Sequence, residues 1–439
     1  MPQHTDAPTA LKVALLGGGT VGSQTARILT EDADILRDRV GADLELTGIA
    51  VRDTGATRDW QADPALYTTD AEALVDGADV VIELMGGIEP ARTLILRALA
   101  AGTSVVTGNK ALLAQHGEEL YAAAAATGAQ LSFEAAVAGA IPILRPLRDS
   151  LGGDRVTRVM GIANGTTNFI LDRMDSEGAD FDDALAEAQR LGYAEADPTA
   201  DVEGHDAAAK AAILATIAFG APYTLDQVAV AGITAITAED NAAAAEAGYV
   251  IKLLAIAERG RAADGAQGAV LRVHPTLLPR EHPLASVRGA FNAVFVEAEN
   301  AGELMFYGRG AGGDPTASAV LGDIVHAARH RVSGPHAAGE SAYATLPILP
   351  IGESLTRYVV RVEVADEPGV LGRVTSAFGD QGVSIESMRQ GVRRSEDGLA
   401  SLTFMTHEAP ESALATTVDT IKKLPDVTSV TSVLRAEGI

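Results

Sequence analysis

The sequence contains no cysteine, which excludes disulfide bonds, zinc sites built on thiolates and the cysteine thioester route of aldehyde-oxidising enzymes. It also lacks a long apolar run, because the longest one, residues 211–221, is too short to cross a bilayer. The opening stretch MPQHTDAPTA has no basic segment followed by an apolar one, as an export signal would have. We therefore expect no membrane partner and a cytoplasmic location.

Positive charge is scarce as well. The chain has 34 Lys and Arg against 59 Asp and Glu, which gives a formal net charge of −25. A surface with that balance repels phosphates over most of its area, so the sequence predicts no nucleic-acid partner. The length of 439 residues exceeds what one hydrophobic core usually supports, and two or three domains are expected.

The first third of the chain alternates short apolar runs with helical patterns. Helices are predicted between five strands, at 11–16, 44–51, 79–85, 104–108 and 130–137. This βαβ alternation is typical of a parallel, doubly wound sheet. We assign residues 1–140 to a Rossmann-like α/β domain.

The order of predicted helices and strands differs in the later segments. Helices at 180–192 and 207–220 and strands at 155–165, 270–278, 292–299 and 304–308, the last two paired, predict a second α+β domain over 141–314. One face of its sheet is expected to be open for a partner subunit. Residues 331–355 are rich in Gly, Pro, Ser and Ala and suit a linker. Residues 356–439 read β, α, β, β, α, β, the order of a small ferredoxin-like domain.

A glycine-rich loop directly follows the first predicted strand. Gly17, Gly19 and Gly22 stand in G-x-G-x-x-G register in LLGGGTVGSQ, and a helical pattern follows. Glycine permits the tight turn and lets backbone N–H groups approach a pyrophosphate at the positive end of that helix. The loop, including Thr20 and Val21, is therefore predicted to bind a dinucleotide.

Two cations follow strand ends of the same predicted sheet. Arg52 precedes Asp53 after the second strand, and an arginine there accommodates a 2′-phosphate, whereas an acidic residue binds a ribose 2′-hydroxyl. This order favours NADP over NAD, and the alternative is that Arg52 is only a solvated charge. Lys110 follows the fourth strand, where such sheets bind ligands, and is a candidate to contact substrate or nicotinamide.

The segment EADPTADVEGHDAAAK, residues 195–210, contains five carboxylates, His205 and Lys210. It suits an acid-rich helix start, a divalent-metal site with His205, or a pocket for an ammonium-bearing substrate. In the pocket, Asp206 and Lys210 share one helix face, and Glu195 returns from the preceding loop. The other acids, which we interpret as loop and helix-start charges, are Asp197, Asp201 and Glu203.

A nicotinamide cofactor without a cysteine nucleophile points to hydride exchange between a carbonyl and an alcohol. This reaction needs a proton donor at the carbonyl oxygen, and a desolvated lysine can serve. Lys210 is the candidate, because the carboxylate of Asp206 can hold its ammonium in place.

Five further motifs follow the glycine loop, in the order VVTGNKALLA, FEAAVAGAIPI, GIANGTTNFIL, GYAEADPTADVEGHDAAAKAAILA and GAGGDPTASAVLGD. Together they resemble the homoserine dehydrogenase family, in the form that carries a C-terminal ACT domain. The resemblance covers nearly the whole chain after the first ten residues. It implies NAD(P)H-dependent reduction of L-aspartate 4-semialdehyde to L-homoserine, on the route to threonine and methionine.

The resemblance also implies roles for single residues. Lys210 would donate the proton to the aldehyde oxygen, and Lys110 would lie beside cofactor and substrate. The second domain would bind the substrate through Glu195, Asp206, Gly165 and Thr166. Gly312 would return to the cofactor, with the helix at 315–330 packing back onto the first domain.

The family further implies a monovalent cation and an effector. Sodium would be bound mostly by main-chain carbonyls, here those of Glu134, Val137, Gly139 and Ile141. The last unit resembles an ACT domain, a type that binds amino acids at dimer interfaces, so a homo-oligomer is expected. Threonine inhibition would act through Asp366, Gly369, Val370 and Leu371, and the alternative is a passive dimerisation unit.

Two other functions stay open at this point. One is a different amino-acid dehydrogenase, such as an amine-releasing one. The other is a non-enzymatic sensor that binds a cofactor and an amino acid. Lys110 and Lys210 together favour catalysis over sensing.

Overall fold

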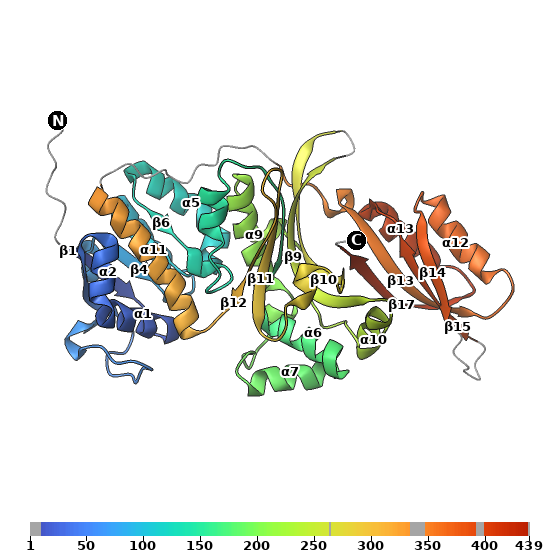
Figure 1. The fold of residues 1–439 in the computed structure, drawn as a ribbon, viewed down its shortest axis with the longest axis horizontal. Coiled ribbons are helices and arrows are strands. Elements are labelled where there is room, and N and C mark those ends of the chain that lie inside the picture. Colours follow the sequence, from blue (N-terminus) through green and yellow to red (C-terminus); the bar gives the residue numbers. More distant parts are fainter. Residues whose placement is uncertain (1–9, 263–264, 334–346, 392–398, 438–439) are drawn as a thin grey trace. The chain divides into compact units, whose positions relative to one another are not determined.

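The computed structural model describes residues 10–262, 265–333, 347–391 and 399–437. These residues form two compact units (Figure 1). Unit 1 contains the described residues of 1–159, 209–227 and 291–345, and unit 2 contains those of 160–208, 228–290 and 346–439.

Unit 1 is built on a six-stranded parallel sheet in the order β3-β2-β1-β4-β5-β6. Its strands are β1 (Ala10–Leu16), β2 (Asp43–Ala50), β3 (Tyr67–Thr68), β4 (Val80–Glu83), β5 (Ser104–Thr107) and β6 (Leu131–Ser132). The helices between them are α1 (Thr20–Glu31), α2 (Ala33–Val40), α3 (Ala71–Asp76), α4 (Ala91–Ala100) and α5 (Lys110–Thr127). Every residue of β4 and β5 is buried, as expected for parallel strands covered on both faces. The predicted doubly wound α/β fold is confirmed.

The predicted strand at 130–137 is wrong over most of its length. Only β6 pairs with the sheet, and a 3-10 turn follows at Glu134–Ala136. The buried carboxylate of Glu134 accepts hydrogen bonds from the backbone N–H groups of residues 143–145, at 2.5, 2.7 and 3.0 Å. Its own N–H donates to Asp323 at 2.7 Å. Because the N–H of Glu134 donates to Asp323 and not to a neighbouring strand, its backbone lies outside the ladder.

A long helix late in the chain completes the core of unit 1. Four apolar residues of α11 (Gly313–Ser333) belong to one core cluster with Val13, Leu15 and Ile82 of the sheet. In Figure 1 this helix lies among the blue elements of the N-terminal sheet. The same unit contains the antiparallel hairpin of β11 (Phe291–Ala298) and β12 (Gly302–Arg309), which confirms the predicted pairing.

Unit 2 contains the helices that follow β7 (Val156–Ile162) and a long antiparallel strand pair. The helices are α6 (Gly165–Glu177), α7 (Phe181–Arg190), α8 (Thr199–Val202) and α10 (Ala238–Glu246), and α9 (His205–Phe219) continues through the division between the units. The paired strands are β9 (Tyr249–Arg261) and β10 (Gln267–Pro279), with the short β8 (Ala229–Val230) beside β10. Sequence analysis missed β9, because eight consecutive buried residues leave no period-two alternation to detect.

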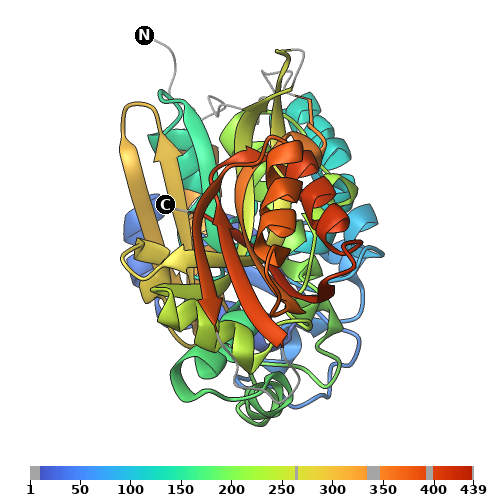
Figure 2. The same cartoon turned by 90° about the vertical axis from the view of Figure 1, so that its right-hand side faces the viewer.

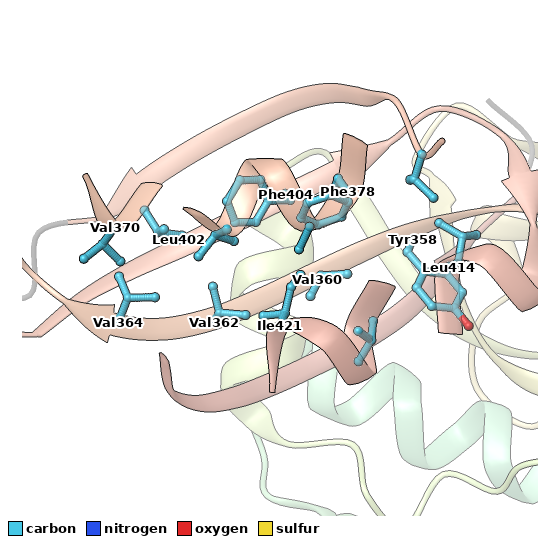
Figure 3. Packing of buried hydrophobic residues seen from close by; sticks show 14 of the residues in the cluster. Tyr358, Val360, Val362, Val364, Val370, Phe378, Leu402, Phe404, Leu414 and Ile421 are labelled. Carbon is cyan, nitrogen blue, oxygen red and sulfur yellow. The ribbon is translucent and has the colours of Figure 1, made fainter. Parts of the chain in front are cut away.

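The C-terminal part of unit 2 is a four-stranded antiparallel sheet in the order β17-β13-β15-β14. Its elements are β13 (Leu355–Ala365), α12 (Val370–Asp380), β14 (Ile385–Gly391), β15 (Leu399–Thr406), β16 (Ala409–Pro410), α13 (Glu411–Ile421) and β17 (Val427–Ala436). Alternate residues Val360, Val362 and Val364 pack with Phe378 and Phe404 into the core beneath the helices (Figure 3). Figure 2 shows α12 and α13 on one face of this sheet. The predicted β, α, β, β, α, β order is confirmed.

The last strand is joined to the rest of unit 2 through β10. β17 pairs in parallel with β10, and Glu437 donates its N–H to the carbonyl of Leu277 at 3.1 Å. The guanidinium of Arg272, only 1% exposed, bonds Glu437 at 2.7 Å and also contacts Glu258. The hydroxyl of Ser354 donates to Glu258 at 3.1 Å.

The residues predicted as a linker, 331–355, have no single structure. Residues 331–333 end α11, and 334–346 lie outside the described residues. Leu349 is buried, and Ile348 forms an isolated bridge with Ala269 of β10. The end of the predicted linker therefore packs on unit 2 as part of its fold. Among the described residues, no helix is both long and apolar enough to cross a membrane.

A buried lysine connects β9 to α6 by a hydrogen bond. Lys252 is fully buried, and its ammonium donates to the side-chain oxygen of Asn168 at 2.9 Å and to the carbonyl of Val287 at 2.6 Å. Burial lowers the pKa of Lys252 from 10.5 to about 8. The folded chain therefore releases this proton at a lower pH than the unfolded chain does.

We predict that Lys252→Met removes a pH-dependent part of the stability. Between pH 8 and 10.5 the unfolded chain holds more protons at this site, so raising the pH favours the folded state of the wild type. The gain across that window is roughly 3 kcal/mol. Urea unfolding of both proteins across the window measures it, with exposed Lys12→Met as the control. Identical pH dependence in wild type and Lys252→Met would contradict the assignment.

Candidate active site

The glycine loop joins β1 to α1 in unit 1. Gly17 has a φ of +106°, and its N–H donates to the carbonyl of Ala50 at 2.9 Å. A Cβ on Gly17 would lie 2.7 Å from the backbone of Leu84, and one on Gly22 would overlap the carbonyl oxygen of Gly17. Both positions thus require glycine, for conformation and for close packing.

The middle glycine has a different role. A Cβ on Gly19 would meet nothing within 4 Å, so open space lies in front of it. Gly19 is also the N-cap of α1, where no side chain caps the helix and no acidic residue stands in the first turn. The free N–H groups at the start of α1, beginning at Thr20 and Val21, can therefore receive a pyrophosphate.

Gly312 lies close to this loop. It has a φ of +124° directly before α11, and a Cβ on the next residue, Gly313, would lie 3.2 Å from the side chain of Thr20. An ion pair of 3.0 Å between Arg27 and Asp314 joins α1 to α11 beside it. The two helices thus begin next to each other.

Two arginines occupy the loop after β2. Arg52 is exposed directly after the strand. Arg58, which sequence analysis missed, donates to the carbonyls of Asp53 and Ala56 at 2.6 and 2.7 Å and lies over the ring of Tyr67. Its Nε is 3.0 Å from where Gly18 would carry a Cβ, so this cation borders the glycine loop. The sequence signal that could have identified Arg58 is the second arginine of the stretch VRDTGATR.

A buried carboxylate organises the next strand ends. Glu83, at the end of β4, is fully buried and accepts hydrogen bonds from the N–H groups of Met85 and Gly86, at 2.8 and 3.1 Å. Its other oxygen accepts the hydroxyl of Thr107 at 2.7 Å. Glu83 thus fixes the ends of β4 and β5 against each other.

This network continues to the start of α5. Asn109 donates its N–H to the hydroxyl of Thr107 at 3.0 Å and its side-chain amide to the carbonyl of Gly87 at 2.7 Å. Its side-chain oxygen accepts the N–H of Leu112 and caps the helix. Lys110 is the first residue of α5 and is exposed, at the strand-to-helix junction where the sequence predicts it.

In unit 2, one side-chain amide gathers two acids of the segment 195–210. The amide of Asn164 donates to Asp201 at 2.7 Å and to Asp206 at 2.9 Å. Its oxygen accepts the N–H of Thr167 at 2.9 Å and caps α6. Asp201 stands in the first turn of α8, which agrees with its interpretation as a helix-start charge, and it also shares this amide with buried Asp206.

The other polar residues of the segment are less enclosed. Glu195 and His205 are exposed, the latter at the first position of α9. Asp197 accepts the N–H and hydroxyl of Thr199, at 3.1 and 2.6 Å, and so starts α8. Asp197 thus precedes the cap position, Pro198, and bonds the first residue of α8, which agrees with its interpretation as a helix-start charge.

The start of α6 is tied to the loop that leads to Glu195. Thr166 donates its hydroxyl to the carbonyl of Tyr193 at 2.6 Å, and the ring of Tyr193 packs on Phe169 at a centroid distance of 5.0 Å. Gly165 is the first residue of α6. Gly165, Thr166, Glu195 and Asp206 thus belong to one connected part of unit 2.

Helix α9 carries the two predicted chemical groups one turn apart. Asp206 is 7% and Lys210 is 8% exposed. Alanines fill the helix between and after them, which leaves the carboxylate and the ammonium as its polar groups in this turn. A buried carboxylate can hold a cation, and a buried ammonium can donate a proton.

The segment predicted to bind a cation turns sharply within unit 1. Ala138 and Gly139 have φ values of +57° and +56°, and a Cβ on Gly139 would overlap the carbonyl of Gly310. Val137 and Ile141 flank the turn and are buried. Burial raises the pKa of the nearby Asp323 carboxyl to about 7.

In the C-terminal domain, the predicted effector residues lie at the turn from β13 to α12. Gly369 has a φ of +90° and precedes α12 without a side-chain cap. Asp366 is exposed, whereas Val370 is buried in the core and Leu371 packs against it. The exposed residues of this turn are thus Asp366, Glu367, Pro368 and Gly369.

Three family models match the chain. Residues 17–134 match the NAD-binding domain of homoserine dehydrogenase, residues 142–325 match homoserine dehydrogenase, and residues 358–426 match the ACT domain.

Full-length relatives agree with these matches. The homoserine dehydrogenase of Corynebacterium glutamicum is 56% identical over 98% of this chain and 96% of its own. A crystal structure of the enzyme from Thiobacillus denitrificans is 41% identical, with a TM-score of 0.89 over 98% of this chain and 99% of its own. A hyperthermophilic archaeal homoserine dehydrogenase mutant in complex with NADPH is 30% identical, with a TM-score of 0.61 over 72% of this chain and 97% of its own. The chain therefore belongs to the homoserine dehydrogenase family of NAD(P)-dependent oxidoreductases acting on CH–OH groups, with a C-terminal ACT domain.

Proposed function

We propose that this chain reduces L-aspartate 4-semialdehyde to L-homoserine with NADPH, using Lys210 as the proton donor. The observation that carries the assignment is the buried pair of Asp206 and Lys210 one turn apart on α9. NADPH, when bound, supplies the hydride to the aldehyde carbon. The chain supplies the proton that the aldehyde oxygen takes up, so the products are the alcohol and NADP⁺.

Lys210 suits the proton transfer because it is buried and held on a helix. A positioned general acid contributes about 10²–10⁴-fold to such a step. Lys110, at the exposed start of α5, is proposed to contact both cofactor and substrate. The network from Glu83 through Asn109 fixes the position of that helix start.

The substrate ammonium is assigned to the carboxylates of Asp206 and Glu195. Asn164 holds Asp206 by its amide, which restricts the rotation of that carboxylate, and Thr166 secures the loop leading to Glu195. Gly165 offers the start of α6 beside them. A charged partner is suited to an amino-acid substrate, because charge-assisted hydrogen bonds are stronger than neutral ones.

NADP is the proposed cofactor, bound at the glycine loop and Gly312. Arg52 is exposed after β2, and Arg58 adds a second cation beside the loop. Two guanidinium groups suit a 2′-phosphate. The hyperthermophilic archaeal relative is in complex with NADPH, which agrees with this choice.

A sodium ion is proposed at the turn formed by Glu134, Val137, Gly139 and Ile141. The sharp turn at Gly139, with a φ of +56°, brings the main-chain carbonyls of this segment close together in sequence, and carbonyl oxygens are ligands that hard cations prefer. Sodium would stabilise this turn, and no step of the reaction passes through it.

Regulation by threonine is proposed at the turn before α12. The first turn of α12 has no side-chain cap, and its backbone N–H groups can donate to a carboxylate, with Val370 and Leu371 shaping the turn. Asp366 can hold the ammonium. A homo-oligomer is proposed as well, because Tyr307 on the outer strand β12 is 55% exposed.

We predict that purified protein reduces NADP⁺ when supplied with L-homoserine, and that Lys210→Met lowers kcat by about a thousandfold. KM for NADP⁺ stays within about twofold, because the substitution removes a transition-state interaction only. Absorbance of the reduced cofactor measures both constants. Lys422→Met, an exposed lysine of the ACT domain, is the control. An unchanged kcat in Lys210→Met refutes the mechanism, and activity only with another amino acid refutes the substrate.

Replacing Arg52 by alanine is expected to raise KM for NADP⁺ by about ten- to a hundredfold, since a charge-assisted contact to the 2′-phosphate is lost. KM for NAD⁺ changes little. Steady-state kinetics with both cofactors measure the ratio. Arg190→Ala on α7 serves as the control. Equal NADP⁺ constants in wild type and Arg52→Ala would show that Arg52 is only a solvated charge.

Threonine should inhibit the wild type, and Asp366→Ala should raise the inhibitory concentration at least about tenfold through the lost ammonium partner. A point substitution is preferable to truncation, because Glu437 neutralises buried Arg272. Activity is titrated with threonine, with exposed Glu408→Ala as the control. Superimposable curves for wild type and Asp366→Ala would leave the ACT domain as a passive unit.

A further inference from the structure

The sheet of the ACT domain carries an ordered pattern on the face opposite α12 and α13. Register places four residues in one row across the strands, namely Arg389, Thr403, Arg361 and Ser432. Two positions along, a second row consists of Ser387, Met405, Val359 and Leu434. Directly paired residues of antiparallel strands share a face, so the first row is polar and cationic and the second is mainly apolar.

These two rows form the floor of a cavity. Helix α10 covers them with Asp240, Ala243, Ala244 and Ala247, which share one side of the helix, and Tyr249 and Leu277 close the cavity. The volume is about 80 Å³. A dry cavity of about 150 Å³ admits benzene, so this space suits roughly three to five non-hydrogen atoms. All of its lining residues belong to unit 2.

The two arginines of the floor differ in their partners. Arg361 has 11% of its side chain exposed and pairs with Asp240 at 3.1 Å and Glu239 at 3.5 Å. The second oxygen of Asp240 is used by Thr237 in the capping box of α10. The charge of Arg361 is thus balanced within the protein.

The charge of Arg389 is not balanced in this way by any acidic residue that the structure describes. Its side chain is exposed at the edge strand β14, and its guanidinium forms no ion pair or hydrogen bond with any residue that the structure describes. It lines the same cavity as Val359, Met405 and Leu434. The cavity therefore presents an available cation at one end and apolar side chains at the other.

We propose that this cavity binds a small aliphatic carboxylate, with its carboxylate on Arg389 and its chain between α10 and the apolar row. A guanidinium matches a carboxylate in charge and in planar geometry. A chain of roughly three or four carbons fits the volume, by the same comparison with benzene. The site is separate from the turn at Asp366, because it lies on the other face of the sheet from α12.

Such a ligand would contact both parts of unit 2. The floor of the cavity is the ACT sheet, and its cover is α10, which leads directly into β9 through Tyr249. A compound bound there would hold α10 on the sheet at the place where β17 continues beside β10. Binding to the folded state alone raises the unfolding temperature.

Calorimetric titration of the full chain with butyrate and valerate tests the proposal, with butyramide as the neutral analogue. We expect saturable binding of both acids, at least about tenfold weaker binding of butyramide, and a similar loss of butyrate affinity in Arg389→Gln. Ala243→Leu should abolish binding by filling the cavity. Arg373→Gln, which alters an exposed arginine on α12 away from the cavity, should bind butyrate as the wild type does.

Enzymatic activity and unfolding temperature establish that each variant is folded, since neither Arg389 nor Ala243 belongs to the proposed catalytic site. Absence of saturable binding by both acids would overturn the proposal. So would unchanged butyrate affinity in Arg389→Gln and Ala243→Leu. Loss of butyrate binding in Asp366→Ala would place the ligand at the turn before α12 and overturn it as well.

Discussion

The side chain of Asn164 is the constraint on which the substrate half of the protein depends. Its oxygen caps α6, and its amide nitrogen holds Asp201 and Asp206 together at 2.7 and 2.9 Å. Two neighbouring carboxylates repel each other, and an amide donor between them lowers that cost without adding a positive charge. The carboxylate of Asp206 is therefore held in place by a hydrogen bond while buried on α9.

Much of the fold was predictable because its signals are local. The glycine register, the strand-to-helix junction at Lys110 and the alternating valines of β13 each depend on residues only a few positions apart. Gly17 and Gly22 illustrate this, because the left-handed φ and the tight packing at the turn are needed within a single loop. Structural requirements that involve only neighbouring residues produce patterns that can be recognised in the sequence.

The features that could not be predicted from the sequence depend on contacts between residues far apart in the chain. Asn164 meets Asp201 and Asp206 across 37 and 42 positions, and nothing near Asn164 in the sequence marks its partners. Glu134 was predicted to be part of a strand, but in the structure its carboxylate accepts hydrogen bonds from the N–H groups of residues 143–145. The strand β9 was missed for another reason, since eight of its consecutive residues are buried, Lys252 among them, and burial on both faces removes the alternation. Polar groups that satisfy distant backbone, and strands buried on both faces, thus escape pattern analysis.

The ion pair of Arg272 also bears on how the chain folds as it is made. Arg272 emerges from the ribosome 165 residues before Glu437, its bonding partner at 2.7 Å. Until the last strand arrives, a guanidinium destined for a fully buried position has Glu258 as its only described acidic partner. Glu258 balances the charge of Arg272, but the Nη2 group has no described acceptor until Glu437 is present, and a buried donor without an acceptor is costly. The full set of hydrogen bonds to Arg272 in β10 therefore forms only after the end of the ACT domain has been translated.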